Sequence, residues 1–191
     1  LPSDTIAPFS SRGPRGFDSK LKPEITAPGV SIFAADMGAG NGGVSMSGTS
    51  MAAPHIAGVA ALMTQAQPFW SPLYIKAAMM NTAVDLADSA SSQIPLQGAG
   101  RVDAYESVFT DLVAYADPKL VSLNWGVIEI NGDYADTQTI TITNFIETGI
   151  SLSIETEFTS DATGATLRAE QENLIFTGIG TSEIEVTLEL D

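Results

Sequence analysis

The chain contains at residues 45–58 the stretch SMSGTSMAAPHIAG, around which the surrounding sequence is organised. Residues 44–47 are expected to form a short strand, and a helix of small residues is expected to begin at Ser50. Gly48 allows the backbone to turn between them without a Cβ clash. The hydroxyl of Ser50 would then lie at a helix N-terminus, where unpaired N–H groups and the helix dipole stabilise developing negative charge. A nucleophile with half of an oxyanion hole has this arrangement.

Two other interpretations of the same residues exist. Thr49 and Ser50 are also good helix caps, because Ser and Thr are favoured at N-caps. His55 is the only histidine of the chain and follows Ser50 by five residues, which rotates it roughly 140° around a helix. We therefore expect His55 to pack as a helix residue and not to act as the base for Ser50. The near match to the Gly-x-Ser-x-Gly elbow of α/β-hydrolases fails because that fold needs an acid and then a His far downstream, whereas the only histidine lies five residues after Ser50.

The run GTSMAAPHIAG at residues 48–58 closely resembles the nucleophile motif of the subtilisin-like serine proteases, the subtilases. The resemblance continues in FSSRGP at residues 9–14, LKPEITAPGV at 21–30 and QGAGRVDA at 97–104, and covers residues 8 to about 115. It implies that Ser50 is the catalytic nucleophile of a serine endopeptidase that forms an acyl-enzyme. It also implies that Ser47, Gly48 and Thr49 line the leaving-group side of the substrate cleft, and that Met51 is sensitive to oxidation.

The fold class that follows is an α/β subtilisin-like C-terminal portion of a catalytic domain, with a parallel sheet and a buried nucleophile helix. Residues 30–35 are expected to form a core strand, and residues 51–67 a helix that is apolar on nearly every side and therefore buried. A second helix is predicted from Ser71-Pro72 to about Thr82, because Ser is a good N-cap and Pro suits the first helical position. A third helix is predicted to open within residues 97–104 and to run through about Leu112.

Beyond Pro118 the hydrophobic period changes from 3.6 to 2. Residues 139–143, 150–154 and 183–190 alternate apolar with polar side chains, which predicts half-buried antiparallel strands. Net charge changes at the same place, from −3 over residues 1–116 to −12 over residues 117–191. We therefore expect two domains, 1–116 and 117–191, the second an all-β sandwich that resembles the fibronectin-type-III-like domain following the catalytic domain in one subtilase subgroup.

Composition excludes several classes of function. The chain has 191 residues, no cysteine, a net charge of −15 and no run of 18 apolar residues, so nucleic-acid binding and a membrane span are not expected. No cofactor and no metal site are expected in these residues, although calcium remains possible in a longer parent protein. No signal peptide is recognisable, and the resemblance to secreted enzymes indicates a piece of a longer, secreted or extracellular precursor.

The resemblance also shows what these residues lack. In subtilases the catalytic Asp, the catalytic His and the oxyanion Asn precede the nucleophile by more than the roughly fifty residues before Ser50. This segment is therefore expected to be inactive alone and to need the upstream part of the same protease chain to act on a protein or peptide substrate. Two alternatives stay open: a binding or spacer module in which the β-sandwich does the work, and a pseudoprotease whose base is defective.

Overall fold

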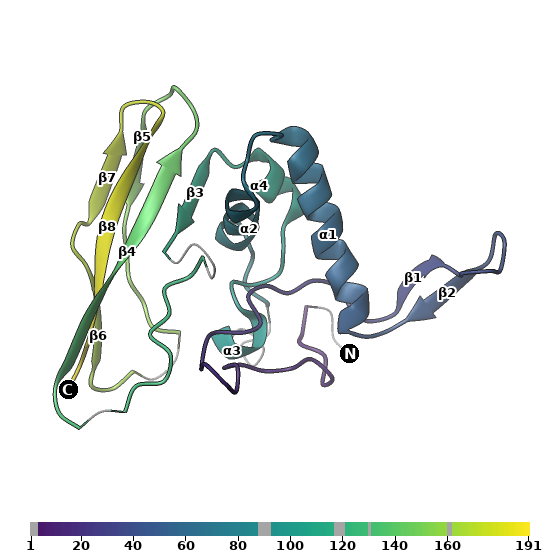
Figure 1. Cartoon of the computed structure of the whole chain (residues 1–191), viewed down its shortest axis with the longest axis horizontal. Helices are drawn as coiled ribbons and strands as arrows, with labels where there is room; N and C mark the ends of the chain where they lie inside the picture. Colours follow the sequence, from purple (N-terminus) through teal and green to yellow (C-terminus); the bar gives the residue numbers. More distant parts are fainter. Residues whose placement is uncertain (1–3, 88–92, 117–120, 130, 160–161) are drawn as a thin grey trace.

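The computed structural model describes residues 4–87, 93–116, 121–129, 131–159 and 162–191. Its helices gather in one region and its longest strands in another, and the two regions lie side by side (Figure 1). A hairpin of β1 and β2 projects from the helical region, on the side away from the strands β4 to β8. In the described ranges, no helix is long and apolar enough to cross a membrane.

Four helices form the first region: α1 (Thr49–Ala66), α2 (Pro72–Asn81), α3 (Ile94–Gln97) and α4 (Ala104–Phe109). The predicted start of α2 is confirmed, because the Ser71 hydroxyl oxygen accepts a hydrogen bond from the Tyr74 amide at 3.3 Å. The predicted third helix is shorter than expected. Gly98 and Gly100 have positive φ angles of 66° and 118°, so a helix cannot pass through them. Asp103 is the N-cap of α4, and its side chain accepts hydrogen bonds from the amides of Tyr105 and Glu106. The helix ends at Phe109, before Leu112.

The strands β1 (Ile32–Ala35) and β2 (Gly43–Met46) occupy the two places predicted for strands around the glycine-rich loop. They pair with each other as an antiparallel hairpin, and Phe33 in β1 is 76% exposed. The expectation of a core strand in a parallel sheet is therefore not met. No parallel sheet is present among the described residues, where Thr26 and Arg101 form an isolated parallel bridge.

The β region consists of a four-stranded and a two-stranded antiparallel sheet. The larger has the order β3 (Leu112–Tyr115), β4 (Tyr134–Asn144), β8 (Gly180–Leu190) and β6 (Ala165–Ala169), and the smaller pairs β5 (Ile150–Ser153) with β7 (Asn173–Phe176). Each of the three predicted alternating segments lies mainly in one of these strands. The two sheets share one core, formed by Leu174 and Phe176 of β7 and by Ile184 and Val186 of β8.

An aromatic cluster joins the two regions. Trp70 and Tyr74, at the start of α2, contact Phe145, which follows β4, with ring centroids 4.8 and 5.3 Å apart. Tyr115 of β3 also lies beside Tyr74, at 6.3 Å. Strand β3 precedes the predicted boundary at residue 116 but pairs with β4 along its whole length. The change in composition at this boundary is therefore not accompanied by a break in hydrogen bonding.

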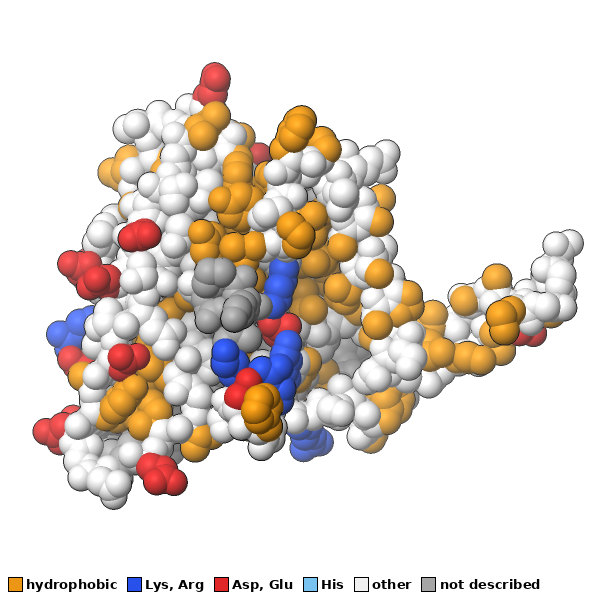
Figure 2. Space-filling model, in the orientation of Figure 1, with side chains coloured by type: hydrophobic (Ala, Val, Ile, Leu, Met, Phe, Trp, Pro, Cys, Tyr) orange, Lys and Arg blue, Asp and Glu red, His pale blue; other side chains and the backbone are white. Residues whose placement is uncertain are grey.

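Helix α1 is less buried than its apolar sequence predicts. Only Val59 and Met63 are buried, where α1 packs against α2 and α4, and its other residues are exposed or half-buried. The prediction of a helix buried on all sides is wrong for the described structure. The physical reason is that α2 and α4 cover one side of α1, while no sheet formed by the described residues covers the other. In Figure 2, apolar side chains are exposed over the helical region, whereas acidic side chains lie mainly over the β region.

Candidate active site

Ser50 is the second residue of α1 and is exposed. Strand β2 ends at Met46, and Gly48 occupies the N-cap position with φ 158° and ψ 163°, a conformation available essentially to glycine alone. The predicted strand, glycine turn and helix are thus confirmed as local structure. No side chain caps the helix, so neither Thr49 nor Ser50 plays the capping role that was the simpler interpretation.

The turn before Ser50 is held by residues 29–31, which sequence reasoning did not single out. The Gly48 amide donates to the Gly29 carbonyl oxygen at 2.8 Å, and the Ser31 amide donates to Ser47 Oγ at 2.8 Å. A Cβ on Gly29 would lie 2.9 Å from the Gly48 carbonyl oxygen. The Ala-Pro-Gly sequence at residues 27–29 was the available signal, since it marks a turn leading to the next strand, but it does not reveal the partner.

The His55 side chain forms a hydrogen bond within its own helix. Its Nδ1 lies 2.8 Å from the Met51 carbonyl oxygen, and because a carbonyl can only accept, Nδ1 must carry the proton. The ring is half-buried. This geometry agrees with the expectation that His55 packs as a helix residue. Since the chain has one histidine, it contains no other imidazole that could deprotonate Ser50.

A cleft of about 760 Å³ lies beside the N-terminus of α1. Gly48 and Thr49 line it, together with the apolar residues Ala52, Ala53 and Ile56 of α1. Ser47 and Ser50 are not among its lining residues, so the structure brings only two of the four predicted site residues into this cleft. The remaining walls come mainly from residues within 4–10 and 23–31, with Leu86 and Arg101, and are mostly apolar.

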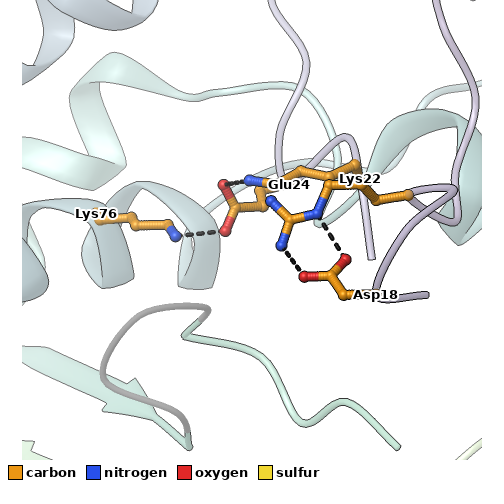
Figure 3. Close-up of polar contacts among 5 residues, drawn as sticks. Asp18, Lys22, Glu24 and Lys76 are labelled. Carbon is orange, nitrogen blue, oxygen red and sulfur yellow. Dashed lines mark hydrogen bonds and ion pairs between the residues drawn. The ribbon is translucent and has the colours of Figure 1, made fainter. Parts of the chain in front are cut away.

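The segment that leads to Gly29 is anchored to the helical region by charge. The Glu24 carboxylate is bound by Lys22 Nζ at 2.6 Å and by Lys76 Nζ of α2 (Figure 3). Burial, the largest single influence, opposes ionisation of Glu24, but the hydrogen bonds and charges of Lys22 and Lys76 together outweigh it, so the pKa of Glu24 is lowered. Two residues later, the Thr26 amide and hydroxyl both donate to the Gly100 carbonyl oxygen, at 2.8 and 2.9 Å.

A second ion pair lies in the same segment. Arg15 binds both carboxylate oxygens of Asp18, with Nε 2.7 Å from Oδ1, and this hydrogen bonding lowers the pKa of Asp18 (Figure 3).

Among the described residues, no group of three or more His, Cys, Asp or Glu side chains is placed to hold a metal ion. At the N-terminus of α1, the site presents the exposed hydroxyl of Ser50.

The subtilase family model matches residues 1–100, more than half of the chain and the whole of the candidate site. The chain belongs to the subtilase family. It is 36% identical over 193 aligned residues to the minor extracellular protease Vpr of Bacillus subtilis (strain 168), an alignment that covers 96% of this chain and 23% of that protein.

Plant subtilases are similar over a shorter stretch. Identity is 40% to the subtilisin-like protease SBT3 of Solanum lycopersicum, over 65% of this chain and 20% of that protein. It is also 40% to the subtilisin-like protease SBT1.4 of Arabidopsis thaliana, over 59% of this chain and 17% of that protein. The chain thus spans a quarter or less of the length of these relatives.

Proposed function

We propose that this chain is the C-terminal part of a serine endopeptidase in which Ser50 is the nucleophile. The observation that carries the proposal is the position of Ser50: an exposed hydroxyl in the first turn of α1, after a glycine N-cap, with no side chain capping the helix. Membership of the subtilase family adds to this geometry.

In the proposed reaction, Ser50 Oγ attacks the carbonyl carbon of a peptide bond and its proton passes to a histidine supplied by another part of the protease. The Ser50 N–H and the positive end of the α1 dipole face the oxyanion that forms, which stabilises it in the transition state. The leaving amine takes the proton from the histidine, and water later hydrolyses the acyl-enzyme. Ser47, Gly48 and Thr49 lie on the leaving-group side of the cleft in this proposal.

The partner that completes the site is the upstream part of the same protease. Two observations support this assignment: the uncovered apolar side of α1 and the apolar cleft beside its N-terminus. An 18-residue helix without a single charged residue leaves a large apolar surface in water, which is unfavourable at about 25 cal/mol per Å². An upstream domain that covered this surface would also bring the catalytic His and Asp to Ser50.

For residues 117–191 we propose a fibronectin-type-III-like domain. Support comes from the two antiparallel sheets that share one apolar core. The domain division at residue 116 is part of the same proposal. A secreted or extracellular location is proposed as well, supported by the name of the Bacillus subtilis relative.

Intact-mass analysis after treatment with a serine-reactive fluorophosphonate tests the proposed function. The samples are the full-length protease with any pro-segment removed, its Ser50→Ala variant, and residues 1–191 alone. We expect one label per molecule in the full-length chain only, lost in Ser50→Ala. If the full-length chain does not label, Ser50 is not an activated nucleophile and the protease proposal fails.

A further inference from the structure

The hydroxyl of Ser47 links the turn before α1 to residues 29–31. Its oxygen accepts the hydrogen bond from the Ser31 amide at 2.8 Å, while the next residue, Gly48, donates its amide to the Gly29 carbonyl at 2.8 Å. These two hydrogen bonds, which we name the 29–31 contact, run in opposite directions between two segments. One is made by Gly48, the N-cap residue of α1, and the other by the residue before it.

We propose that Ser47 is a positioning residue for Ser50, acting through the 29–31 contact. The proposal rests on the proposed role of Ser50 as nucleophile. Only Gly48 and Thr49 separate Ser47 from Ser50, so the orientation of the backbone at residue 47 is carried directly into the first turn of α1. With the Ser47 bond removed, the two segments would still be joined by the Gly48 to Gly29 bond and by the β1–β2 pairing, which ends at Ile32 and Met46. The side chain of residue 47, however, would no longer fix its backbone relative to Ser31.

The backbone of residues 29–31 is shaped for this contact. Ser31 has a φ of 54°, in the left-handed region that non-glycine residues rarely adopt, and this conformation accompanies the direction of its amide toward Ser47. Gly29 permits the close approach on the other side, since its Cβ would meet the Gly48 carbonyl oxygen at 2.9 Å. A strained residue and a glycine on either side of Val30 thus both serve the same two hydrogen bonds.

Holding Ser50 in place matters because the rate of a catalysed reaction falls sharply when a reacting atom is displaced. A misplacement of 1 Å at a reacting atom can cost about a hundredfold in rate. Ser47 is exposed, so its hydrogen bond competes with water and contributes on the order of what an ordinary hydrogen bond contributes, which corresponds to about a fivefold change in an equilibrium or rate.

The test compares three variants of the full-length protease: Ser47→Ala, Ser47→Thr and the control Ser45→Ala. Ser45 lies two residues earlier in exposed β2, and no side-chain hydrogen bond involves it within the described ranges. We expect Ser47→Ala to lower both kcat and the rate constant of fluorophosphonate labelling about fivefold with KM unchanged. Ser47→Thr, which keeps the hydroxyl, restores both values, and Ser45→Ala leaves them unchanged.

Amide hydrogen exchange in the inactive Ser50→Ala background provides a readout that is independent of activity. Ser47→Ala should speed exchange at Ser31, and Ser47→Thr should restore its protection. Wild-type labelling together with an unchanged rate in Ser47→Ala overturns this inference while the proposed function stands. A rate that stays low in Ser47→Thr although Ser31 is again protected also overturns it. A wild-type chain that does not label refutes the proposed function and the catalytic part of this inference with it.

Discussion

Replacement of Gly29 by alanine should displace Ser50, the proposed nucleophile, without contacting it. The new Cβ would lie 2.9 Å from the Gly48 carbonyl oxygen and 3.4 Å from the Ala52 Cβ. Ordinary contact begins at 3.4 Å, so residues 29 and 48 must separate by about 0.5 Å. The Gly48 to Gly29 hydrogen bond, now 2.8 Å, would lengthen by a similar amount. On a scale of about a hundredfold in rate per 1 Å, we expect a fall of about tenfold.

The assay is the rate constant for fluorophosphonate labelling of Ser50 in the full-length protease, followed by intact mass. Gly16→Ala is the matched control, because a Cβ there meets nothing within 4 Å. Thermal unfolding of both variants in the Ser50→Ala background measures the accompanying loss of stability, expected at about 1–3 kcal/mol for Gly29→Ala. If Gly29→Ala labels as fast as Gly16→Ala, the close approach of residues 29 and 48 does not position the nucleophile.

Three further predictions concern stability and the surroundings of the nucleophile. Met63 is fully buried, so Met63→Ala should lower the free energy of unfolding by about 2–5 kcal/mol, whereas exposed Gln65→Ala should stay within about 0.5 kcal/mol in the same denaturant titration. Glu24→Gln should cost about 1–2 kcal/mol at pH 7. Because the pKa of Glu24 is lowered in the folded state, this difference from wild type should be present above the ordinary value of 4.5 and vanish as the pH falls through the lowered pKa, as melting curves at several pH values would show. Peroxide treatment of the full-length protease should slow labelling of Ser50 in step with sulfoxide formation at Met51. A Met51→Leu variant that loses labelling equally fast under peroxide would show that oxidation of Met51 is not the cause.

Local sequence signals were sufficient for the elements that depend on neighbouring residues. The turn at Gly48 and the helix after it follow from a residue without a Cβ and a run of small helix-forming residues. The start of α2 follows from Ser71-Pro72, because the cap hydroxyl and the fixed φ of proline act within one turn. The strands β4 and β8 follow from alternation, since one face of each is buried, as Ile184 and Val186 show.

Local signals failed where the outcome depended on distant residues. The sequence indicated strands at residues 30–35 and 44–47 but could not choose between an antiparallel hairpin and a core sheet. The apolar sequence of α1 predicted burial, yet burial requires a partner surface, and the described residues cover only the side near Val59 and Met63. The third helix begins at Ala104, within the predicted range, but ends at Phe109, because the chain soon enters β3, whose pairing with β4 depends on a distant strand.

The sequence by itself therefore determined which serine lies at a helix N-terminus, and the family motif around it. Only the tertiary structure decided how that serine is held. The bond from Ser31 to Ser47 joins residues sixteen apart, and the contacts of Thr26 with Gly100 join residues seventy-four apart. No local propensity encodes such pairs, because their formation depends on the approach of two backbones that is set by the packing of the whole domain.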